Sequence, residues 1–138
     1  MYLVEMNQLP AVTLYKAGHH GSKTSSSELL MKVIKPEIVC VCCCAGSEEY
    51  TDTDANQFPT QQFVDNVAPY TDKVYVTTIC VDYDAGTFAS MNGNITVVTD
   101  KNGTRVICGS GDDRVLKDWE WFRAHRTTPA AWATAPAE

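Results

Sequence analysis

An unbroken apolar run at residues 38–44, Ile-Val-Cys-Val-Cys-Cys-Cys, constrains the fold of this chain most strongly. A strand that is apolar at every position must be covered on both faces, as in a sheet that lies between other layers. Apolar residues at helical spacing over about residues 25–34 and 60–68 predict a helix on either side of this strand in the chain. Shorter apolar runs at residues 12–17 and 74–79 predict two more strands. This alternation predicts an α/β fold in which parallel strands are joined by helical crossovers.

The ends of the first helix follow from local chemistry. Ser25 is the expected N-cap, with Glu28 reaching back to it in a capping box. Pro36 is expected to end the helix, because the residue before proline avoids the helical conformation. The expected core-facing stripe consists of Leu29, Leu30, Val33 and Ile34.

The pattern changes in the last third of the chain. Short β-type runs at residues 86–91, 94–99 and 104–108, separated by turn signals such as Asn92-Gly93, predict an antiparallel meander of three strands. A short helix is expected over residues 115–125, with Leu116, Trp119 and Phe122 on one face. Residues 1–126 are therefore expected to form one α/β domain, and the Pro/Ala-rich residues 127–138 a disordered tail.

Length and charge limit the classes of function. A chain of 138 residues suits one domain with a real core. The net charge of −6 argues against a nucleic-acid-binding surface, so nucleic acid is expected only as a substrate. No apolar run approaches the ~20 residues of a membrane span, and the first residues lack signal-peptide character. The chain as given is expected to be cytoplasmic; as part of a longer secreted or membrane protein it would lie outside the cytoplasm.

Six cysteines are present, four of them within residues 40–44. Neighbours along a strand point to opposite faces, so this cluster does not suit disulfides, and no second C-x-x-C pair accompanies it. The cysteines are interpreted as small apolar residues of a buried strand. A thiolate metal cluster is the alternative.

Two adjacent histidines, His19 and His20, lie between the first expected strand and the first expected helix. Imidazole is a common metal ligand, and Gly18 and Gly21 on either side let the backbone turn sharply. Hydroxyl side chains follow at Ser22, Thr24 and Ser25. The pattern is compatible with a functional site, and equally with an ordinary strand-to-helix loop that has a polar tip.

Acidic side chains gather in two further segments. Glu48, Glu49, Asp52 and Asp54 belong to a polar segment that is interpreted as a solvated loop, because the calcium-loop pattern is absent. Asp82 and Asp84 are expected in a turn after a strand. Trp119, Trp121 and Phe122 near His125 are expected to pack in the core or at an interface.

The run Lys-Ala-Gly-His-His-Gly-Ser-Lys-Thr-Ser-Ser at residues 16–26 resembles the K-x-G-H-H-G-S-x-x-S-S signature of the metallo-β-lactamase fold, in the branch that includes the nuclease-like domain of ComEC-type competence proteins. The resemblance implies a four-layer αββα sandwich whose site binds two divalent ions, zinc or manganese. It implies a metal-ligand role for His19 or His20, with His19 favoured. Ser22, Lys23, Thr24 and Ser25 would support the ligands or contact substrate.

The chain also departs from this family. It contains no H-x-H-x-D-H motif, which supplies most of the family's ligands, and Phe58 replaces the histidine of an expected His-Pro pair. The chain is therefore expected to be the C-terminal half of such a domain, partnered by the missing half or by a second copy. Complete, it would hydrolyse a phosphodiester, ester or lactone through a metal-bound hydroxide; alone, it is expected to be nearly inactive. The alternative is a non-catalytic module that dimerises.

Overall fold

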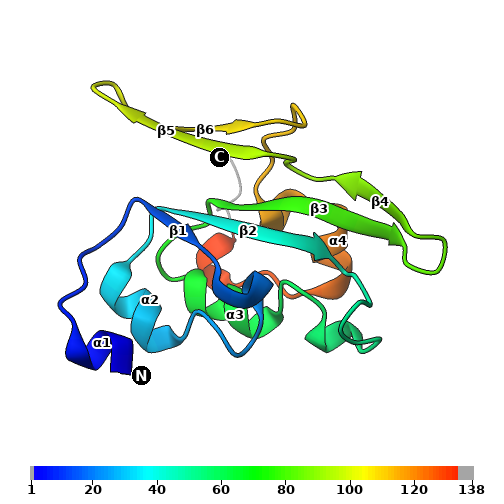
Figure 1. Cartoon of the computed structure of the whole chain (residues 1–138), viewed down its shortest axis with the longest axis horizontal. Coiled ribbons are helices and arrows are strands. Elements are labelled where there is room, and N and C mark those ends of the chain that lie inside the picture. The colour runs from blue at the N-terminus through cyan, green and yellow to red at the C-terminus, as the bar shows by residue number, and fades with distance from the viewer. Residues whose placement is uncertain (1, 134–138) are drawn as a thin grey trace.

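The computed structural model describes residues 2–133 and has a mixed α/β fold (Figure 1). Its main sheet has four strands in the order β1-β2-β3-β4, with β1, β2 and β3 parallel and β4 antiparallel to β3. The predicted parallel crossovers are confirmed. The strands are β1 (Leu14–Lys16), β2 (Ile38–Ala45), β3 (Val74–Asp82) and β4 (Thr87–Ser90).

Helices cover one face of this sheet (Figure 1). Val39 and Val41 of β2 and Val76 of β3 are fully buried there against Phe63 and Phe122 from the helices. The helices are α1 (Tyr2–Met6), α2 (Glu28–Ile34), α3 (Gln61–Val67) and α4 (Glu120–His125), with short 3₁₀ turns at Gly18–Gly21, Asp54–Asn56, Leu116–Asp118 and Ala130–Trp132.

A two-stranded hairpin, β5 (Ile95–Asp100) and β6 (Gly103–Cys108), lies over the opposite face (Figure 1). It packs on Ile38, Cys40 and Tyr75, which form a second, smaller core. The hairpin covers only the first half of β2, because Cys42 further along the same face is exposed. The apolar run is thus covered on both faces only where β5 and β6 reach it.

The predicted three-stranded meander is wrong in its pairing. The first of its strands, β4, pairs with β3 in the main sheet, and only β5 and β6 form a hairpin with each other. Asn92 explains the break: its side-chain oxygen accepts from the Val76 amide at 2.8 Å, and its side-chain nitrogen donates to the carbonyls of Asp112 and Arg114. The buried amide group therefore anchors the crossing between the sheets, where a hairpin turn was expected.

The start of α2 also differs from the prediction. Ser27 is the N-cap, since its hydroxyl accepts a hydrogen bond from the Leu30 amide at 3.3 Å. Ser25 is free for another contact, described below. The buried stripe also differs from the expected one, because Met31 is fully buried while Leu29 is 37% exposed.

The end of the described chain is packed against the helices, although a disordered tail was expected from Thr127. Trp132 is 2% exposed, contacts Phe122 and donates from its indole nitrogen to the Thr71 carbonyl at 2.8 Å. The rest of the expected tail, residues 134–138, lies outside the described residues. Within residues 2–133, none of the helices has the length and apolar character needed to cross a membrane.

Candidate functional site

The two adjacent histidines lie in the short 3₁₀ turn between β1 and α2. Both have left-handed backbone conformations, with φ of 43° at His19 and 57° at His20. For residues with a Cβ this conformation costs about 1–2 kcal/mol each. Such strain persists only where the surrounding structure enforces it, and it is concentrated at functional sites.

Contacts at both ends of the turn enforce this conformation. The Gly21 carbonyl accepts hydrogen bonds from the amide and the hydroxyl of Thr60, at 3.0 and 3.2 Å. Gly21 has a φ of 77°, and a Cβ there would lie 3.0 Å from the Pro59 Cβ. At the other end, the Ser25 hydroxyl donates to the Gly18 carbonyl at 2.6 Å. The turn is therefore clamped between α2 and the start of α3.

Among the described residues, one ring nitrogen of His20 has a hydrogen-bond partner and the other has none. Its Nδ1 lies 2.6 Å from the carbonyl oxygen of Cys42 on β2. Because a carbonyl only accepts, Nδ1 must donate, and in the neutral ring Nε2 is left as a bare acceptor. A backbone carbonyl on the far nitrogen is the usual support of a metal-binding histidine.

His19 lies among hydroxyl groups. Its Nδ1 is 3.2 Å from Thr24 Oγ1, which is itself 3.1 Å from Ser22 Oγ. A hydroxyl can donate or accept, so these contacts do not select one tautomer. The centroids of the two imidazole rings lie 6.2 Å apart, so the rings are neighbours.

The polar residues predicted to surround the histidines do not all contact them. Ser22 is 5% exposed and Ser25 half-buried, and both bond within the turn, which indicates that they hold its shape. Thr24 contacts His19 directly. Lys23 is exposed and donates to the Asn56 side chain at 2.8 Å, away from both imidazoles.

A small niche with both aromatic and polar walls adjoins His20. It has a volume of about 110 Å³, and its residues are His20, Cys42, Cys43, Cys44, Ser47, Glu49, Tyr50 and Phe58. The His20 ring is stacked with Tyr50 and Phe58, at centroid distances of 6.4 and 6.0 Å. Phe58 thus forms a wall of the niche.

The donors in the described part of the chain do not amount to a complete metal site. Among residues 2–133, no three His, Cys, Asp or Glu side chains come together as a group that could hold a metal ion. A catalytic zinc ion takes three protein ligands, so the two histidines fall short of that set.

Burial makes several of the cysteines of β2 poor thiolate donors. All six are free thiols. Burial raises the pKa of Cys40 to about 11 and also raises the pKa of Cys43 and Cys44 above that of an ordinary thiol. Protonated thiols are poor metal ligands, which favours their interpretation as apolar strand residues.

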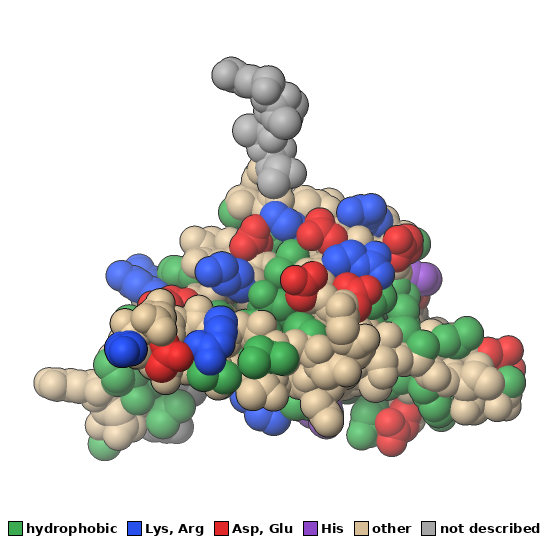
Figure 2. Space-filling model, turned by 90° about the horizontal axis from the view of Figure 1, so that it is seen from above, with side chains coloured by type: hydrophobic (Ala, Val, Ile, Leu, Met, Phe, Trp, Pro, Cys, Tyr) green, Lys and Arg blue, Asp and Glu red, His purple; other side chains and the backbone are tan. Residues whose placement is uncertain are grey.

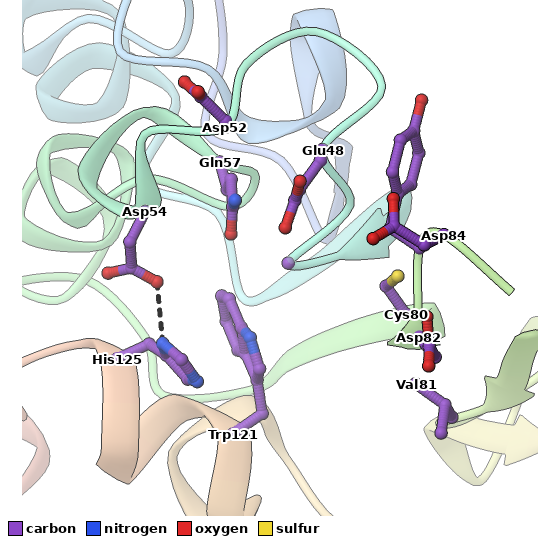
Figure 3. A pocket seen from close by; sticks show the side chains of 12 residues that line it. Glu48, Asp52, Asp54, Gln57, Cys80, Val81, Asp82, Asp84, Trp121 and His125 are labelled. Atoms are coloured by element: carbon purple, nitrogen blue, oxygen red, sulfur yellow. Dashed lines mark hydrogen bonds and ion pairs between the residues drawn. The ribbon is translucent and has the colours of Figure 1, made fainter. Parts of the chain in front are cut away.

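A second cavity, acidic and larger at about 440 Å³, also lies beside the loop that follows β2 (Figure 3). Its carboxylates come from the loop after β2 and from the turn after β3, and they are Glu48, Asp52, Asp54, Asp82 and Asp84. Figure 3 shows the two groups on opposite sides of the cavity, with Trp121 of α4 between them. The acidic segments that were interpreted separately thus face one another across one cavity.

One side of this cavity is fixed by an ion-pair network that the sequence analysis missed. Asp54 lies 2.6 Å from His125 Nδ1 (Figure 3). It also lies 3.3 Å from a guanidinium nitrogen of Arg126. The Arg126 side chain is 1% exposed and also donates to the carbonyls of Gln57 and Pro59. Burial lowers the pKa of Arg126, and Asp54 offsets part of this effect. The network ties α4 to the loop that carries the acidic residues.

No protein-family model, curated protein or solved structure matches the chain. Function therefore rests on the chemistry of the site. The distinctive elements of the site are the strained backbone of the histidine pair, the hydrogen bond from His20 to Cys42, and the niche beside His20.

Proposed function

We propose that this chain supplies the histidine loop of a metal-dependent hydrolase of the metallo-β-lactamase type. The hydrogen bond from His20 Nδ1 to the Cys42 carbonyl carries the proposal, because in the neutral ring it leaves Nε2 as the acceptor, beside a cavity. The left-handed backbone at two successive histidines adds support, because such strain is concentrated at functional sites. This geometry favours His20 as the ligand, whereas the sequence motif favoured His19.

The remaining ligands of the proposed site come from another polypeptide segment. The partner is the other half of a four-layer αββα sandwich or a second copy of this chain. Support for such a partner comes from the sheet face beyond β5 and β6, where Cys42 is exposed and Phe88 is 55% exposed. A partner sheet packed on this face would bury both side chains.

The other predicted residues have supporting roles in this proposal. Ser22 and Ser25 keep the turn rigid, and Thr24 orients His19. Lys23 is exposed and follows the pair closely in sequence, as the exposed Lys16 precedes it. The reaction class is the hydrolysis of a phosphodiester, ester or lactone with bound zinc or manganese.

The purified chain, incubated with zinc or manganese and a generic phosphodiester or aryl ester, tests the proposal. We expect little or no turnover, because the described donors do not complete a metal site. Robust turnover that survives both His19→Ala and His20→Ala would contradict the proposal.

The exposed sheet face also favours a second candidate, a non-catalytic module that dimerises. Every residue of the edge strand β4 is exposed, and none carries a charge that would block pairing with another strand. Light scattering separates the two candidates: a stable dimer without histidine-dependent zinc binding supports the module, and a monomer counts against it.

A further inference from the structure

The acidic cavity lies at the carboxyl ends of two parallel strands, β2 and β3. Its carboxylates come from the loop that follows β2 and from the end of β3 and the turn after it. In open α/β sheets, ligands bind in the crevice outside the carboxyl ends of the parallel strands. One wall of the cavity comes from α4, which packs on the opposite side of the sheet from the face on which a partner is proposed.

Four of the five carboxylates that line this cavity have no cationic partner among residues 2–133. They are Glu48, Asp52, Asp82 and Asp84, whereas Asp54 is paired with Arg126. None of the described residues that line the cavity is Lys or Arg. In Figure 2 the right-hand end of the molecule, which carries the turn between β3 and β4, shows acidic and hydrophobic side chains and no basic ones. The charge of the cavity therefore favours a cation as its ligand.

A buried amide group provides a second, independent indication of a ligand. Gln57 is 8% exposed, and Figure 3 shows its side chain pointing into the cavity. Its side-chain nitrogen donates to the Thr51 carbonyl at 3.5 Å, but no described residue donates to its side-chain oxygen. Buried amide oxygens normally accept a hydrogen bond. Since no fully enclosed side-chain atom of the described chain lacks a partner, this oxygen is open to the cavity and to a donor on a ligand.

The spacing of the acceptors favours an extended cation over a single metal ion. Among residues 2–133, no three His, Cys, Asp or Glu side chains form a group that could hold a metal ion. The carboxylates of the loop after β2 lie across the cavity from those at the end of β3, with Trp121 between the two groups (Figure 3). Val81 and Tyr83 add further apolar surface to the lining. A methylene chain can pack on such a surface while the charged groups that it carries stay beside the carboxylates.

We propose that the acidic cavity binds a linear aliphatic polyamine such as spermidine. Its ammonium groups contact the carboxylates on the two sides of the cavity, and its methylene chain lies along Trp121. One ammonium group donates to the side-chain oxygen of Gln57. The inference does not depend on the proposed hydrolase function, because no residue of the histidine turn lines this cavity.

Spermidine tests the inference in an NMR titration of the ¹⁵N-labelled chain in about 0.15 M salt, where distant charges are screened. We expect a saturable shift of the Trp121 indole signal and of the amide signals of Glu48 and Asp82. Propylamine has a single ammonium group, and we expect it to bind at least tenfold more weakly. A pentapeptide with two lysines should also bind more weakly than spermidine. Magnesium chloride at the same concentration should leave the Trp121 signal unchanged.

Two double variants with the same change of charge make the test specific. Glu48→Gln combined with Asp84→Asn is expected to weaken spermidine binding at least fivefold. Glu37→Gln combined with Asp113→Asn removes the same charge outside the cavity, and is expected to change the affinity less than about twofold. All four positions are exposed, so both double variants should fold.

Each of four results would overturn the inference. Equal loss of affinity in the two double variants would show that net charge alone attracts spermidine. A magnesium response equal to that of spermidine would assign the cavity to a metal ion, and tighter binding of the lysine peptide would assign it to a basic protein segment. A spermidine titration that does not saturate would show that the cavity is not a binding site.

Discussion

At the scale of single residues, Gly21 carries the strongest constraint in the histidine turn. It has a left-handed φ of 77°, and a Cβ would lie 3.0 Å from Pro59 Cβ and 3.3 Å from Val41 Cγ1. Gly86 offers a matched comparison, because its φ of 65° is similar but no atom lies within 4 Å of a Cβ there. The two positions separate backbone strain from steric crowding.

We expect Gly21→Ala to lower the free energy of unfolding by about 2–4 kcal/mol, the sum of backbone strain and overpacking. Gly86→Ala should cost only about 1 kcal/mol, because strain acts there alone. Urea denaturation of both variants measures the difference. Equal losses would show that the histidine turn is not clamped by Pro59 and Val41.

Sequence reasoning at this scale identifies groups but not their distant partners. The histidine pair and its flanking glycines stand out from local chemistry alone. The contact between Asp54 and His125 joins residues 71 positions apart, so no local pattern could predict it. The hydrogen bond from His20 to the Cys42 carbonyl could not be predicted either. Every residue has a backbone carbonyl, so the residue types do not show which carbonyl a side chain contacts.

At the scale of elements, β2 shows how one strand serves two environments. Val39, Val41 and Ala45 are fully buried beneath the helices, whereas Cys40 lies under the β5–β6 hairpin and Cys42 is exposed. The apolar run predicted the strand and its parallel neighbours correctly. The same run could not show that the β5–β6 hairpin covers Cys40 but leaves Cys42 exposed. The position of the hairpin depends on how Asn92 anchors the chain between the two sheets, and not on the residues of β2.

The buried thiols of this strand predict a loss of stability in alkali. Burial raises the pKa of Cys40 to about 11, so above the ordinary thiol pKa of about 9 the unfolded chain loses its proton first. The free energy of unfolding should therefore fall between pH 9 and 11, with Cys40 contributing roughly 2 kcal/mol. Denaturation series at several pH values measure this fall. Cys40→Ala should reduce the slope. A flat profile, or a slope that Cys40→Ala leaves unchanged, would contradict this interpretation.

At the scale of the whole molecule, the loop after β2 lines both the niche beside His20 and the acidic cavity, so the strained histidine turn and the acidic residues lie near each other. Arg126 and His125 bind that loop to the end of α4. The strand and helix order was predictable because it follows from periodicity. The grouping of these features was not, since it arises only when the crossovers bring the loops to the same edge.

The central claim is that His20 is prepared to bind a metal through Nε2. A zinc titration of the ¹⁵N-labelled chain, followed by the imidazole nitrogen signals, tests it most directly. We expect zinc to shift the His20 Nε2 signal, weakly because the donor set is incomplete, and to lose this effect in His20→Ala but not in His125→Ala. Zinc that leaves the His19 and His20 signals unchanged, or whose effect disappears in His125→Ala, would contradict the claim.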